Sequence, residues 1–214
     1  MKCPACNTTV AEEELYCPKC GTQLKSDSNN SSFQDSQANA GVQLLQLNHL
    51  NMVHNKMARR INFTFEDSNG NVLGEALGEA LGEGMVVLKY TIVDPSQQPL
   101  FILSTTGRFR ITNYNIEDPN GKVLATLKMK SSFMGRKYAL DIDDAESMLV
   151  TADVANSHFK IVGLNGNLIS TGTRLMALMN SSTEIDIAED AQVDHRIVLG
   201  AMVMINFFSY RGIP

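Results

Sequence analysis

The sequence lacks the short motifs that usually mark an enzyme. It contains no Gly-x-Ser-x-Gly turn, no glycine-rich phosphate loop ending in Lys-Ser or Lys-Thr, and no His-Glu-x-x-His zinc motif. Its histidines are isolated ones: His49, His54, His158 and His195. Single histidines in such settings are usually structural, although His195 borders the last apolar segment, where a response to pH is a secondary reading. We therefore predict a protein that is not an enzyme.

An excess of basic residues is also absent. Lys and Arg number 18 against 23 Asp and Glu, which gives a formal net charge of −5 and an isoelectric point near 5.4. No global positive field attracts nucleic acid or an anionic membrane, so any such contact needs a local patch. Because Met1 is not followed by a charged and then apolar leader, we expect a cytoplasmic protein.

Cysteine is absent after residue 20. All four cysteines fall in CPACNTTVAEEELYCPKC, as Cys3, Cys6, Cys17 and Cys20. Two Cys-x-x-Cys pairs at this spacing are typical of a zinc ribbon, in which four thiolates complete a closed tetrahedral shell. The alternative, a pair of disulfides, does not suit a leaderless chain in a reducing compartment. We predict one structural zinc per chain, with no open coordination position for catalysis.

The predicted ribbon is followed by a change in composition. Residues 25–40, KSDSNNSSFQDSQANA, are mostly Ser, Asn, Gln and Asp, which predicts a flexible linker. The expected domains are a zinc ribbon at 1–24, this linker at 25–40 and a main domain at 41–214. Residues 1–25 carry three lysines and three glutamates, so we expect the ribbon to bind a protein partner and do not favour nucleic acid.

The start of the main domain allows two interpretations. Apolar residues recur at spacings of three and four, which favours a helix: Leu44, Leu47, Leu50, Val53 and Met57. Asparagines between them are poor helix formers, so an irregular first strand stays open.

Five similar copies follow and predict β-hairpins. They are FTFEDSNGNVL from Phe63, YTIVDPSQQPL from Tyr90, YNIEDPNGKVL from Tyr114, YALDIDDAESML from Tyr138 and FKIVGLNGNLI from Phe159. Each opens aromatic-x-apolar, passes a cluster of turn residues and returns to an apolar residue. Five hairpins predict ten or more strands in a meander. Between the first two copies, LGEALGEALGEG repeats every four residues, which predicts either a helix weakened by glycine or a mobile acidic loop.

The last apolar segment has a single polar side chain, Asn206, between Ile197 and Phe208. As a helix it is about 18 Å long, short of the roughly 30 Å core of a bilayer. Because it is apolar on all sides, we expect protein around it, and a barrel of ten to twelve strands leaves an interior that such a helix fills. Gly200 and Ala201 would let the barrel wall approach. Asp190 or Asp194 would complement the start of the helix and Arg211 its end.

These hairpins and the closing stretch GAMVMINFFSY resemble the Tubby C-terminal-like fold, shared by Tubby proteins, LURP-one-related proteins and phospholipid scramblases. The resemblance covers residues 42–212 and looks closest to the scramblase branch, through Gly200, Ala201, Ile205, Asn206 and Phe207. It implies a mainly β protein, with a closed barrel of about 12 antiparallel strands around a buried C-terminal hydrophobic helix.

The resemblance also has departures. The palmitoylated cysteine cluster of animal scramblases has no counterpart here, nor does their proline-rich arm. The family's calcium-binding stretch aligns with carboxylates at Glu184, Asp186, Glu189, Asp190 and Asp194. A regular calcium loop starting at Asp186 would need glycine and glutamate where Ala191 and Ile197 stand, so we do not expect bound calcium.

One local patch is basic. Residues 121–140 have no acidic side chain and hold candidate lipid-binding residues at Lys128, Lys130, Arg136 and Lys137. They would meet anionic phospholipid headgroups at the membrane periphery, or form a solvated face that answers the acidic stretch 141–153. Tubby proteins bind phosphoinositides on a basic barrel surface, which the resemblance carries over as an expectation. The predicted function is a scramblase-like module that associates with phospholipids or assists their movement between leaflets. The alternative is a soluble interaction or regulatory module with the barrel as scaffold.

Overall fold

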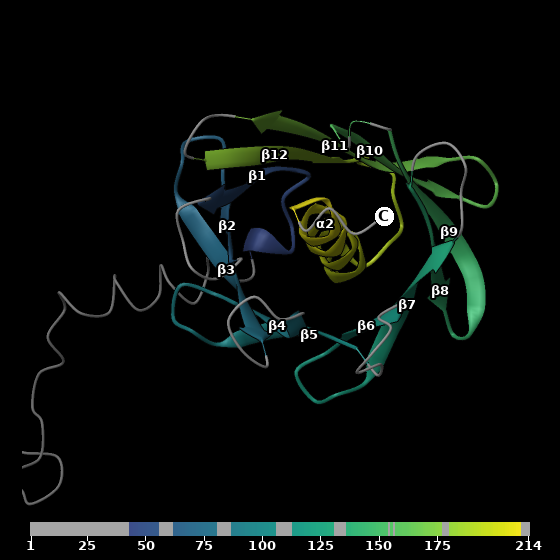
Figure 1. The fold of residues 1–214 in the computed structure, drawn as a ribbon, viewed down its shortest axis with the longest axis horizontal. Helices are drawn as coiled ribbons and strands as arrows, with labels where there is room; N and C mark the ends of the chain where they lie inside the picture. The colour runs from purple at the N-terminus through teal and green to yellow at the C-terminus, as the bar shows by residue number, and fades with distance from the viewer. Residues whose placement is uncertain are drawn as a thin grey trace, which may run out of the picture. The chain divides into compact units, whose positions relative to one another are not determined.

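The computed structural model describes residues 43–55, 62–80, 87–105, 113–130, 136–153, 155, 157–176 and 180–210. Twelve antiparallel strands close into a barrel around one long helix (Figure 1). The strands follow one another around the wall in sequence order, and β1 closes the barrel by pairing with both β2 and β12. The predicted barrel of about 12 strands around a C-terminal helix is confirmed.

The bounds of the elements are β1 His49–Asn55, β2 Phe63–Glu66, β3 Val72–Ala80, β4 Val87–Val93, β5 Pro99–Ser104, β6 Asn113–Glu117, β7 Val123–Lys130, β8 Arg136–Ile142, β9 Ala145–Ala152, β10 His158–Gly163, β11 Leu168–Met176, β12 Asn180–Ile187 and the helix α2 His195–Tyr210.

All five predicted hairpins are present, from β2–β3 to β10–β11. Strand alternation turns the opening aromatic residue of each copy inward, and all five are buried: Phe63, Tyr90, Tyr114, Tyr138 and Phe159. Each hairpin also contains a register shift close to its turn. Such bulges increase the local twist, which a closed barrel requires.

Turn chemistry explains the repeated Asp and Gly of the copies. Gly70, Gly121 and Gly166 have φ of 81°, 85° and 84°, a region that glycine enters without steric cost. In the first turn, Oδ1 of Asp67 accepts hydrogen bonds from the backbone amides two and four residues later, at 2.8 and 2.9 Å. Asp118 accepts the equivalent pair, both at 2.9 Å. The motif residues therefore build the turns.

The preference for a helix at the start of the main domain is wrong beyond its first turn. The amide of Leu47 donates to the carbonyl of Gln43, which makes one helical turn, and β1 follows from His49. Leu50, Met52 and His54 are buried, whereas Asn51 and Val53 are partly exposed, so an alternation of two replaces the expected spacing of three and four.

The Gly-Glu-Ala-Leu repeat is also corrected, because its described part is strand β3 and neither helix nor loop. A period of four is twice the strand period of two, so the repeat keeps its small residues on one face. Gly74, Ala76 and Gly78 are buried, whereas the side chain of Glu79 lies outside and approaches Lys89 of β4 at 3.7 Å. Close packing accounts for the glycine at 74, where a Cβ would lie 2.6 Å from the Val93 carbonyl oxygen.

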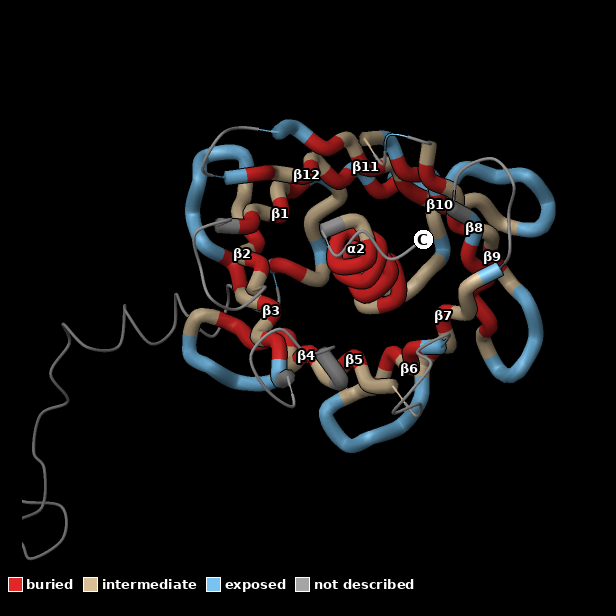
Figure 2. The backbone as a smooth tube through the Cα atoms, in the orientation of Figure 1, coloured by how far each residue is buried: buried red, intermediate tan, exposed pale blue. Residues whose placement is uncertain are grey.

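The helix α2 occupies the centre of the barrel, and its residues from Ile197 to Phe208 are all buried (Figure 2). A Cβ on Gly200 would lie 2.9 Å from Leu103 and 3.0 Å from Ile116, so the wall does approach closely there. Within the described part of the chain, no helix has the length and apolar character needed to cross a bilayer.

The helix begins with a cap. Oδ1 of Asp194 accepts the amide of Arg196 at 2.9 Å, and the Asp194 carbonyl accepts the amide of Ile197 at 2.9 Å. Of the two aspartates expected to complement the helix start, Asp194 is the one that caps it. Arg211, expected at the helix end, lies outside the described residues.

The strand directions give the barrel two different ends. The hairpin end holds the five tight turns, the segment 188–194 and the start of α2. The distal end holds the starts of the even-numbered strands and the end of α2. Aromatic rings gather around the distal half of the helix, where Tyr90 meets Phe207, and Tyr114 and Tyr138 meet Phe208, each with ring centroids 5.8 Å apart.

Candidate functional site

A buried polar cluster joins the barrel wall to the helix. Arg174 of β11 donates to Oδ1 of Asn206 through Nε at 3.1 Å and through Nη2, and Oγ1 of Thr183 donates to the same oxygen at 2.9 Å. The guanidinium also lies over the ring of Phe159, 5.3 Å from its centroid. Nδ2 of Asn206 donates to the carbonyl of Met202 at 2.9 Å. These contacts fix the helix in the barrel and give no sign of a reactive group.

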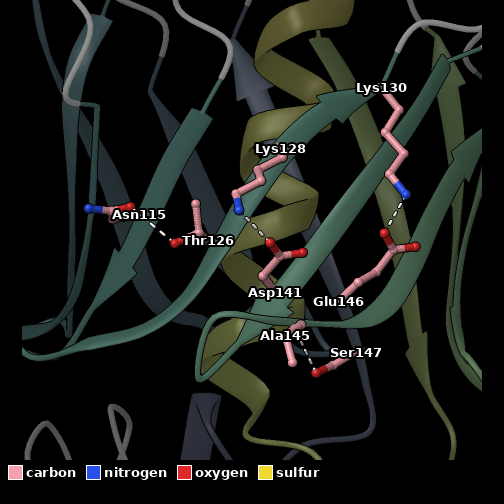
Figure 3. Close-up of polar contacts among 8 residues, drawn as sticks. All are labelled: Asn115, Thr126, Lys128, Lys130, Asp141, Ala145, Glu146 and Ser147. Carbon is pink, nitrogen blue, oxygen red and sulfur yellow. Dashed lines mark hydrogen bonds and ion pairs between the residues drawn. The ribbon is translucent and has the colours of Figure 1, made fainter.

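The basic patch lies on the outer face of β7 and β8. Nζ of Lys128 donates to Oδ2 of Asp141 at 2.5 Å, and Nζ of Lys130 donates to Glu146 (Figure 3). The hydrogen bond and charge of Asp141 raise the pKa of Lys128. Lys137 of β8 is exposed, with no ion pair to any residue that the structure describes. The side chain of Arg136 lies outside the described part.

These two ion pairs favour the interpretation of the patch as a solvated outer face. Two of the four candidate cations form ion pairs with acidic residues of the stretch 141–153, as expected of a solvated outer face. Only 10% of the Asp141 side chain is exposed, whereas Glu146 and Lys130 are exposed by 40% and 43%. The two pairs therefore differ: the first is shielded and the second is open to solvent.

Charge is separated along the barrel axis. The segments at the hairpin end, 66–72, 93–99, 117–123, 141–146, 162–168 and 188–196, carry twelve acidic residues and two basic ones. The other described residues carry five acidic and seven basic ones. The positive end of the α2 dipole lies at the acidic end, which is the favourable arrangement. An anionic surface is therefore repelled from the hairpin end.

The histidines occupy separate places. His54 is buried, and its Nδ1 donates to the carbonyl of Asn62 at 2.9 Å. His49 pairs with Asp186 on the outer face at 2.6 Å. Nδ1 of His195 is buried and lacks a hydrogen-bond partner in the described structure, and burial lowers the pKa of this histidine while Asp194 opposes the shift.

A serine, a histidine and an aspartate do meet at the β9–β10 connection, but their geometry is not that of a catalytic triad. Oγ of Ser157 donates to Oδ2 of Asp153 at 2.7 Å, and the same carboxylate oxygen lies 3.1 Å from Nδ1 of His158. The hydroxyl also faces that nitrogen, at 3.0 Å, so a single ring nitrogen serves both partners. Burial raises the pKa of Asp153, but hydrogen bonds from Ser157 and His158 outweigh it and lower the pKa. The aspartate closes a turn.

The carboxylates of the calcium stretch do not form a metal site within the described residues, and the predicted zinc ligands are not among those residues. Cys3, Cys6, Cys17 and Cys20 lie outside the described residues, so the zinc ribbon stays a prediction. Within the described ranges, no three His, Cys, Asp or Glu side chains gather as a metal site would require. Of the carboxylates aligned with the calcium stretch, Glu184 and Asp186 lie on β12, and Asp194 caps α2.

Sequence reasoning missed the Arg174–Asn206 contact. Its partners are 32 residues apart, and neither belongs to a local motif. A lone polar residue in the apolar helix was the available signal, since a buried amide needs a partner on the wall.

Comparison with known proteins gives the family. No curated protein matches the sequence significantly. An Arabidopsis thaliana protein of known X-ray structure is similar, with a TM-score of 0.51 and 16% identity, covering 74% of this chain and 90% of that one. At this identity the likeness concerns the fold alone. The LURP-one-related family matches residues 50–206, which is most of the chain. The barrel, its central helix and this match together establish that the chain belongs to the LURP-one-related family, which has the Tubby-like fold.

Proposed function

We propose that the barrel is a non-enzymatic module that associates peripherally with anionic phospholipid membranes through its distal end. The observation that carries the proposal is the separation of charge along the axis, with twelve acidic and two basic residues at the hairpin end. Repulsion at that end leaves the distal end and the adjoining β7–β8 face for contact with negative headgroups. Lys137, exposed near the start of β8, is a described cation on this side of the barrel.

The packing of the interior supports docking on the surface over insertion. α2 lies inside the barrel with Ile197 to Phe208 buried, and its Phe207 and Phe208 contact aromatic rings of the wall. A lipid path through the barrel would require α2 to leave, which exposes a large apolar area to water. Assisted movement of lipid between leaflets therefore depends on a rearrangement that this packing opposes.

Flotation of the full chain with vesicles tests the proposal. Phosphatidylcholine vesicles with phosphatidylserine should carry the protein at low salt and less of it at high salt, because exposed ion contacts are screened. Lys137→Gln should weaken binding, and Lys122→Gln at the hairpin end is the matched control that should not. Equal loss in both variants would indicate an effect of net charge and contradict docking by the distal end.

The second candidate is a soluble interaction module in which the zinc ribbon binds a protein. Residues 1–25, which contain the Cys-x-x-Cys pairs and carry three lysines against three glutamates, favour it. If the protein fails to float at either salt concentration, this second function becomes the better one.

A further inference from the structure

We propose that Lys130 and Lys137 form a pair that binds one phospholipid headgroup, and that the carboxylate of Glu146 competes with lipid for it. This inference rests on the membrane association proposed above and concerns its regulation. Glu146 acts as an internal anion that restrains docking.

The two lysines stand directly opposite each other on β7 and β8. Both are exposed on the outer face. Opposite residues of an antiparallel pair have Cβ atoms about 5 Å apart, and like charges at this position repel. An anion between the two ammonium groups relieves that repulsion, and a phosphate group offers several oxygens to do so.

Glu146 forms an ion pair with only one of these two lysines. Its carboxylate accepts the Lys130 ammonium, which points across the sheet toward β9 (Figure 3). Lys137 is left without an ion pair among the residues described. Because the Lys130 and Glu146 side chains are 43% and 40% exposed, this pair is weak and lipid phosphate can replace it.

The neighbouring ion pair, Lys128 with Asp141, is shielded from solvent. This excludes Lys128 from the proposed headgroup site. Asp141 is only 10% exposed and holds Lys128 at 2.5 Å. A shielded carboxylate that loses its cation is left uncompensated, so Lys128 stays with Asp141 when the surface meets a membrane. Lys128 is therefore a structural residue of the outer face, and the headgroup pair is Lys130 with Lys137.

The test uses the full chain and vesicles of phosphatidylcholine with phosphatidylserine. Glu146→Gln frees Lys130 and should tighten binding about fivefold, the value of one additional cation near an anionic surface. Lys137→Gln added to Glu146→Gln should remove this gain. Lys128→Gln combined with Asp141→Asn, which removes the neighbouring pair without changing the net charge, should leave binding of the folded protein unchanged. Thermal melts of each variant check folding, and Glu146→Ala is a second way to free Lys130.

The control is Glu189→Gln, which makes the same charge change at an exposed position of the hairpin end, away from the proposed contact surface. If Glu189→Gln tightens binding as much as Glu146→Gln, net charge explains the gain and the competition by Glu146 is refuted. If the wild-type protein binds the vesicles and neither Glu146 variant binds more tightly, the competition by Glu146 is also refuted, while the proposed function stands. If no variant binds the vesicles, the proposed function itself fails.

Discussion

Arg174 of the wall donates two hydrogen bonds, from Nε and Nη2, to Oδ1 of Asn206 in the helix. The Thr183 hydroxyl donates a third to the same oxygen. Removing the amide alone leaves a buried guanidinium without this acceptor. We expect Asn206→Leu to lower the free energy of unfolding by about 3 kcal/mol, measured by urea denaturation.

Replacing both partners should cost less than that single change. Arg174→Met with Asn206→Leu substitutes apolar groups for the pair, which is often close to neutral. Costs that simply add in the double variant would show that the two residues are energetically independent.

Gly200 is predicted to resist substitution in spite of helix propensity. Alanine is favoured over glycine inside a helix by about 1 kcal/mol. Here its Cβ would lie 2.9 Å from Leu103 and 3.0 Å from Ile116, and such overpacking costs about 1–3 kcal/mol. We expect Gly200→Ala to lower the melting temperature, and Ile116→Val in the same chain to restore part of it. A variant that melts above wild type would show that the wall yields without cost.

The apolar end of the chain should behave as core. Val203 is fully buried, so Val203→Lys places an unpaired charge inside the barrel at a cost of several kcal/mol. This variant, or truncation after Asp194, should abolish cooperative melting, and Ala201→Leu should destabilise by about 1–3 kcal/mol. A truncated domain that stays monomeric and melts like wild type would mean that the helix is not needed to fill the barrel.

Stability should fall in mild acid because of His195. Burial lowers its pKa below the ordinary value of 6.5, so the folded state binds this proton less readily than the unfolded chain does. The lost stability accumulates as pH falls from about 6.5 toward the folded pKa. His195→Gln should flatten the pH dependence of unfolding in this window. Parallel curves for the variant and wild type would assign the effect to another group.

The zinc prediction concerns the N-terminal cysteines alone. Metal analysis of purified protein should give about one zinc per chain, because four thiolates complete one tetrahedral shell. Cys6→Ser should abolish it while the melting of the barrel barely changes. Native protein that contains no metal would contradict the predicted zinc ribbon.

The repeated hairpins were predictable because each copy carries its own information. The aromatic residue that opens a copy, such as Tyr114, sits one strand period from a second apolar residue and a few residues from an Asp that binds the turn amides. The closing helix was predictable because an apolar segment too short for a bilayer needs protein around it. These signals are local, and no partner needs to be known.

Other features depended on distant partners. The repeat around Gly74 has a period that suits both helix and strand, and its neighbours β2 and β4 decide the outcome. The basic stretch containing Lys128 shows no acidic residue in sequence, yet strand pairing brings Asp141 to its ammonium group. Arg174 reaches Asn206 only after the barrel has closed.

The closure of β1 on β12 sets the order in which this chain is able to fold. His49 pairs with Asp186, and α2 follows every strand in the sequence. During synthesis, the inward faces of eleven strands leave the ribosome before the last strand and the helix that cover them. Contacts of such long sequence separation slow folding and leave apolar surface exposed to aggregation. We expect slow refolding and a strong demand for chaperones during synthesis, imposed by a core whose centre is made last.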